Sequence, residues 1–85
     1  MNSNKQNLIN KIKYRSKYRG TKEMDIFVKS FVNKVINDLS FDDLEQLGKL
    51  VNLSDEKIIE ISTGNTKNSI SKKISRLLID HKENK

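Results

Sequence analysis

The sequence predicts an all-α fold, a small compact bundle of about five helices, and three observations support this class. Between residues 24 and 39, apolar side chains recur at the i, i+3, i+4, i+7 spacing of one helix face, and adjacent apolar pairs break the alternation typical of a strand. The 85 residues include no Pro and only three Gly, so few residues interrupt a helix. Capping residues followed by acids precede several of the apolar segments.

Two helices are expected on either side of Gly20. Leu8 and Ile12 recur at helical spacing and predict a first helix of about ten residues. Gly20 ends this helix, and Gly20 or Thr21 caps the second, which is expected over residues 22–39. The inward face of the second helix is formed by Met24, Phe27, Val28, Phe31, Val32, Val35, Ile36 and Leu39.

A third and a fourth helix are expected in the middle of the chain. Ser40 can cap the backbone amide of Asp43 and so begins the third helix. Ser54 caps a fourth helix over residues 55–63, and Gly64 ends it in the left-handed conformation. The inward residues of the third helix are Phe41, Leu44, Leu47 and Val51.

The last expected helix follows a polar linker at residues 65–68 and begins at Asn68 or Ser69. Its inward residues are Ile70, Ile74, Leu77 and Leu78. Residues 1–7 are polar and residues 80–85 are charged, so we expect both ends to be mobile. The 85 residues are expected to form a single helical domain.

The net charge of +6 is unevenly distributed and excludes several classes of protein. Residues 1–22 carry seven basic and no acidic side chains, residues 23–61 carry four basic and nine acidic, and residues 62–85 carry six basic and two acidic. No apolar stretch reaches the roughly 20 residues of a membrane helix, so we expect no membrane insertion. The absence of Cys excludes disulfides and thiolate zinc sites and fits a reducing compartment.

Residues that would support catalysis are scarce, and we assign none to catalysis, to a metal or to a bound cofactor. The single His, His81, lies in the charged tail without a cluster of further ligands. The side chains of Asp42 and Asp43 diverge by about 100° on a helix, and capping explains them. We therefore expect that the chain is not an enzyme.

The turn that begins at Arg19 is the part of the sequence that points to a function. By residue type alone it is a helix boundary, in which Gly20 and Thr21 form caps and Glu23 and Asp25 complement the helix dipole. That account does not explain Arg19, whose long cationic side chain stands next to a glycine. An ion pair between Arg19 and Glu23 on an exposed turn would form a docking surface.

Residues 14–25, YRSKYRGTKEMD, resemble the signature of the succinate dehydrogenase assembly factor 2 family, also called the flavinylation factors. That signature is Arg-Gly-x-x-Glu, followed by an apolar residue and Asp and opening a long apolar helix. The Tyr-Arg-Ser before the motif and the Thr-Lys within it resemble the alphaproteobacterial and mitochondrial branch. The resemblance covers roughly residues 14–64.

The resemblance implies an assembly factor, a chaperone that binds the flavoprotein subunit of succinate dehydrogenase and promotes covalent attachment of FAD to a His of that subunit. The corresponding subunit of fumarate reductase is a further candidate partner. The chain itself is expected to bind no FAD stably and to act as a monomer. We expect a bacterial cytoplasmic protein in preference to one of the mitochondrial matrix, because the motif leaves little room for a cleaved presequence before it.

The same resemblance assigns the partner-binding residues. Arg19 would pair with acceptors on the partner, Gly20 would permit close approach of the backbone, and Glu23 would orient Arg19 or meet a partner cation. Ile26 lies outside the apolar stripe of its helix, so it would add exposed apolar area beside the motif. The further partner-binding candidates are Lys22 and Asp25.

Nucleic-acid binding is the alternative function. Residues 13–19 alternate cations with Tyr14 and Tyr18, which could neutralise phosphates and stack on bases. The competing interpretation is a solvated basic face with Tyr14 packed on the core. We favour that interpretation, and expect no nucleic acid as partner, because the acidic middle of the chain would repel a long polyanion.

Overall fold

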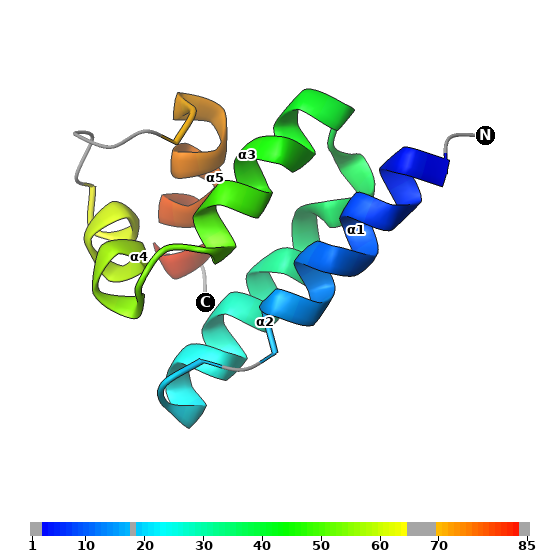
Figure 1. Cartoon of the computed structure of the whole chain (residues 1–85). Helices are drawn as coiled ribbons and strands as arrows, with labels where there is room; N and C mark the ends of the chain where they lie inside the picture. The colour runs from blue at the N-terminus through cyan, green and yellow to red at the C-terminus, as the bar shows by residue number, and fades with distance from the viewer. Residues whose placement is uncertain (1–2, 18, 65–69, 84–85) are drawn as a thin grey trace.

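The computed structural model describes residues 3–17, 19–64 and 70–83, and every regular element in these ranges is a helix (Figure 1). The predicted all-α class is therefore confirmed. The helices are α1 (Ser3–Arg15), α2 (Lys22–Val35), the short 3-10 helix η1 (Ile36–Asp38), α3 (Phe41–Val51), α4 (Asp55–Ser62) and α5 (Lys72–Glu83).

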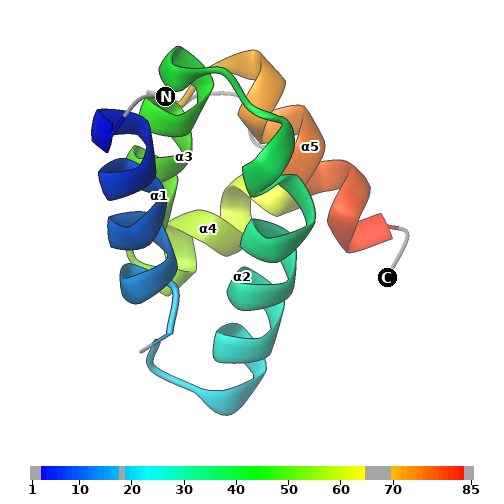
Figure 2. The same ribbon diagram turned by 90° about the vertical axis from the view of Figure 1, so that its right-hand side faces the viewer.

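The helices form a bundle in which α3 is central. Helix α1 packs against α3 and α2, while α5 packs against α4 and α3. Figures 1 and 2 both show α1 and α2 next to each other, with α4 and α5 on the side of α3 away from α1. The predicted inward face of the second helix lies in this core, since all of its residues are buried except the half-buried Phe27. Complete burial of such side chains contributes about 1.5–3 kcal/mol each.

The predicted N-caps are present at three helices. The hydroxyl of Thr21 accepts from the amide of Met24 at 3.1 Å, and Ser40 accepts from Asp43 at 3.2 Å. The hydroxyl of Ser54 likewise caps α4. Each bond satisfies an amide that has no partner within its helix. At the other end of α4, Gly64 has a φ of 106°, as predicted for a left-handed cap.

The two terminal helices and the end of α2 differ from the predicted boundaries, since α2 ends at Val35 and residues 36–38 form η1. Helix α1 begins at Ser3 and therefore includes most of the residues assigned to a polar end, whereas α5 begins only at Lys72. The hydroxyl of Ser71 accepts from the amide of Ile74, so Ser71 caps α5 in place of the predicted Asn68 or Ser69. The predicted linker and those two residues fall outside the described ranges. Mobility at the chain ends stays a prediction.

Three side chains lie where the sequence pattern did not place them. Phe41 is 38% exposed, because it is the first residue of α3 and lies at the edge of the core. Tyr14 is 64% exposed and does not pack on the core as expected. His81 lies within α5, and its ring contacts the rings of Phe27 and Phe31 at centroid distances of 5.5 and 5.6 Å. These ring contacts pack the last turns of α5 against α2.

Candidate partner-binding site

The guanidinium of Arg19 is held inside the molecule by three acceptors at the junction of α3 and α4. Its Nε donates to Oδ1 of Asp55 at 2.8 Å, and its Nη1 donates to the carbonyl of Val51 at 2.6 Å. Its Nη2 donates to the carbonyl of Leu53 at 2.6 Å. The Arg19 side chain is only 8% exposed. Charge-assisted bonds of this kind are strong, and their loss would leave a largely buried charge without partners.

The expected pairing of Arg19 with Glu23 is therefore wrong. The carboxylate that binds Arg19 is that of Asp55, 36 residues further along the chain. Arg19 precedes the helix, so helical spacing does not bring its side chain to Glu23. Because all three guanidinium nitrogens donate within the chain, we interpret Arg19 as a residue that positions the turn.

Gly20 allows the close approach of the Asp55 carboxylate to the backbone. The amide of Gly20 donates to Oδ2 of Asp55 at 3.1 Å. A Cβ added at Gly20 would lie 3.0 Å from the same oxygen, so any side chain would require the carboxylate to shift. Gly20 thus leaves room for the Asp55 carboxylate, so the close approach to its backbone is made by a side chain of the same chain.

Asp25 holds the turn from the other side, because its Oδ1 accepts from the backbone amide of Arg19. We call the four residues Arg19, Gly20, Asp25 and Asp55 the clamp. The clamp joins the start of α2 to the start of α4 through the Arg19 side chain, the backbone amides of Arg19 and Gly20, and the two carboxylates. Three of the predicted partner-binding residues belong to it.

The other predicted partner-binding residues face solvent. Lys22 and Glu23 are exposed in the first turn of α2, and Ile26 is 54% exposed one turn later. The structure thus divides the six predicted residues into three that form hydrogen bonds within the clamp and three that have exposed side chains. Glu23 and Ile26 are neighbours on the surface of α2, because residues three apart lie on the same side of a helix.

A groove of about 650 Å³ runs between α2 and α4 beside the clamp. Glu23, Met24 and Phe27 line it from α2, and Ile59, which is 45% exposed, lines it from α4. It is completed by Thr21, Asp55, Glu56, Ser62 and Lys82. This α2/α4 groove has an apolar floor and mainly acidic charged residues at its edges, which suits an apolar segment carrying cations.

Sequence reasoning missed two residues of this site. Asp55 stands in the first turn of its helix, where an acid is expected to complement the helix dipole, and its role in the clamp depends on packing. Ile59 is one of three isoleucines, with Ile58 and Ile61, in a short helix. The signal that was available is the spacing, since residues 58 and 61 are three apart and share a face, whereas residue 59 points elsewhere.

Two other kinds of feature are absent from the described residues. No helix among them is long and apolar enough to cross a membrane. In the same part of the chain, no group of three or more His, Cys, Asp or Glu side chains could hold a metal ion.

A model of the family described as flavinator of succinate dehydrogenase matches residues 10–82. The chain belongs to this family. The matched residues extend beyond the predicted range of 14–64 and include the clamp and every residue that lines the α2/α4 groove. Neither a curated protein nor a solved structure matches the chain. The clamp and its charged turn therefore lie within the residues that the family model matches.

Proposed function

We propose that this chain binds the flavoprotein subunit of succinate dehydrogenase, with that of fumarate reductase as a further candidate, and promotes covalent attachment of FAD to it. The observation that carries this proposal is the family match over residues 10–82, whose description is flavinator of succinate dehydrogenase. The geometry supports an assembly factor, because the turn motif forms a rigid clamp beside an open groove. The chain supplies no reacting group in this proposal.

The contact surface proposed here is the outer part of the turn together with the α2/α4 groove. Glu23 and Ile59 lie on opposite walls of the groove, and Ile26 extends the apolar surface next to Glu23. Glu23 would meet a cation of the partner, with Lys22 at the edge of the contact. Arg19, Gly20 and Asp25 contribute by holding this surface in one conformation.

A rigid surface of this kind can assist a reaction on another protein by selecting one of its conformations. Binding the conformer in which the flavin and the acceptor His are close shifts the population toward it. Positioning of reacting groups can lower a barrier by several kcal/mol, up to about 7–11 kcal/mol in the best cases. Because the clamp limits movement of the turn, little ordering entropy is lost on binding.

We further propose that the chain binds no FAD stably, acts as a monomer and works in the cytoplasm. The α2/α4 groove carries the carboxylates of Glu23 and Glu56, which would repel the pyrophosphate of FAD. FAD is therefore expected to be bound by the flavoprotein, and the groove to bind a protein segment.

Coexpression with the flavoprotein subunit tests the proposal. The wild-type chain should raise covalent flavin, seen as fluorescence that survives denaturing electrophoresis. Glu23→Ala and Ile59→Asp should lower that fluorescence severalfold while the helical circular dichroism stays unchanged, because both residues are exposed. Lys29→Ala, on the exposed side of α2, is the matched control. Unchanged covalent flavin in both groove variants would contradict the proposed surface.

A further inference from the structure

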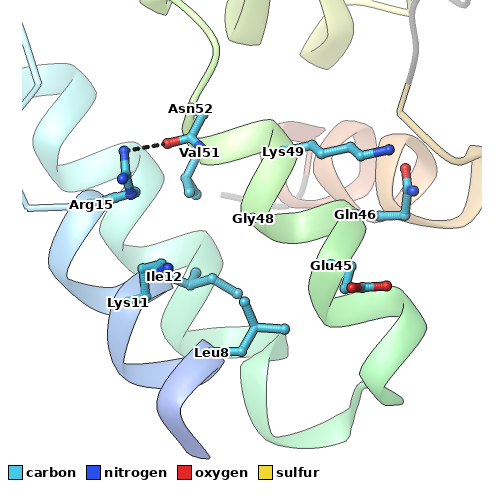
Figure 3. Close-up of a pocket in the computed structure, with 10 residues that line it drawn as sticks. All are labelled: Leu8, Lys11, Ile12, Arg15, Glu45, Gln46, Gly48, Lys49, Val51 and Asn52. Atoms are coloured by element: carbon cyan, nitrogen blue, oxygen red, sulfur yellow. Dashed lines mark hydrogen bonds between the residues drawn. The ribbon is translucent and has the colours of Figure 1, made fainter. Parts of the chain in front are cut away.

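A second groove lies between α1 and α3 and has a volume of about 400 Å³ (Figure 3). It shares no lining residue with the α2/α4 groove. Leu8 and Ile12 line it from α1, and Gly48 lines it from α3. Figure 3 shows the Glu45 and Lys49 side chains directed away from α1.

Gly48 lies in the interior of α3 and is not required by the packing of the fold. A Cβ added there would lie 3.8 and 3.9 Å from two Ile12 carbons and 4.0 Å from Leu8, which are ordinary contacts. A glycine within a helix is less favourable than an alanine. The missing side chain therefore leaves space in the groove that the folded chain itself does not use.

The charge of this groove is the opposite of that at the α2/α4 groove. Helix α1 contains no acidic residue, and Lys11 and Arg15 line the groove one helical turn apart. Arg15 donates to Oδ1 of Asn52 at 2.9 Å, a bond drawn in Figure 3, and the guanidinium keeps other donors for a ligand. Lys49 and Glu45 also belong to the lining, but their side chains are directed away from α1, so Lys11 and Arg15 are the cations on the α1 side of the groove.

We infer that the α1/α3 groove binds an acidic amphipathic helix of a partner protein. An apolar side chain of that helix would lie over Gly48, and two of its carboxylates, one turn apart, would meet Lys11 and Arg15. A nucleic acid fits less well, because the groove lining contains a carboxylate and no aromatic side chain for base stacking. This surface lies outside the one proposed for the flavoprotein, so either proposal can fail without the other.

The probe for this inference is a labelled synthetic helical peptide with Leu along one face and Glu at i, i+4 spacing beside it. The full chain should bind it at low salt, with amide shifts centred on Lys11 and Gly48. Lys11→Glu combined with Arg15→Glu should weaken binding by at least about tenfold, because attraction becomes repulsion. Lys29→Glu combined with Lys34→Glu makes the same charge change on exposed positions of α2 and should leave binding within about twofold.

Gly48→Ala separates binding from folding. It should weaken peptide binding severalfold by filling the groove floor, while the melting temperature rises by about 2–8 °C because the helix gains propensity. A structural role for Gly48 alone would lower stability and leave binding unchanged, and would overturn the inference.

Three further results would also overturn it. The first is equal binding of a peptide with Lys in place of Glu, and the second is amide shifts centred on the α2/α4 groove. The third is that an oligonucleotide, or a second copy of this chain, competes with the peptide for the groove and that this competing binding is lost in the Lys11→Glu, Arg15→Glu variant.

Discussion

Arg19 and Glu23 belong to the same turn, but their side chains have opposite surroundings. Arg19 is 8% exposed and donates to three acceptors at the junction of α3 and α4. Glu23 is exposed on the wall of the α2/α4 groove. Residues of one short motif can therefore have two different tasks. In this chain the inward residues hold the turn in place, and the outward residue is available to a partner.

The largest effect expected from this comparison is on stability. Arg19→Ala or Asp55→Ala should lower the free energy of unfolding by about 3 kcal/mol, because each leaves a largely buried charged group without its partner. Glu23→Ala should change it by no more than about 0.5 kcal/mol, as is usual for an exposed residue. Urea denaturation followed by circular dichroism measures both. Equal losses at residues 19 and 23 would show that the turn does not have an internal and an external side.

A smaller effect is expected at Gly20. Gly20→Ala should lower the free energy of unfolding by about 1 kcal/mol. The added Cβ would lie 3.0 Å from Oδ2 of Asp55, so the carboxylate must shift. In an Asp55→Ala background the same substitution should cost little, since the opposing oxygen is gone. A double-mutant cycle from denaturant unfolding measures this coupling. Additive costs would locate the strain elsewhere in the turn.

The smallest effect is expected at an ion pair that contrasts with the clamp. Lys73 Nζ lies 2.7 Å from Oδ2 of Asp43 on the surface, and the pKa of Asp43 is lowered from its usual 3.8, first by this hydrogen bond. A lowered pKa in the folded state means that the stabilisation is present above pH 3.8 and is lost as the pH falls through the folded-state value. Salt screens such an exposed pair.

Asp43→Asn tests this prediction. As the pH drops below about 4, the melting temperature of this variant should fall slightly less steeply than that of the wild type. The difference between the two proteins should shrink in 0.5 M salt. The ion pair between Arg19 and Asp55 should contribute a stabilisation that is less sensitive to salt, because the Arg19 side chain is largely buried. A steeper acid decline in Asp43→Asn than in the wild type would contradict the sign of the pKa shift.

Local features of this chain were predictable because their causes lie within a few residues. The apolar face of α2 and the caps at Thr21, Ser40 and Ser54 each depend on contacts across one helical turn or less. The boundary of α5 was misplaced because several polar residues before it are acceptable caps. Only the packed structure selects Ser71, whose amide also donates to Oε1 of Gln46.

The candidate site was predictable in part. Resemblance located the turn, and the register of α2 correctly placed Ile26 at the surface. The partner of Arg19 was not predictable, because Asp55 lies 36 residues away and any of nine acids in the middle of the chain had a suitable charge. Ile59 was similarly ambiguous, since a short helix offers too few repeats to define its buried face.

The sequence by itself determined that the chain is helical, where most of its helices begin, and which family its turn resembles. These properties follow from helix periodicity, from capping by residues a turn away, and from a contiguous motif. Tertiary structure alone decided which charges of that motif point inward and which remain accessible. The reason is physical: a guanidinium is stabilised by whatever carboxylate and carbonyls the packed helices bring to it, and here α4 brings Asp55.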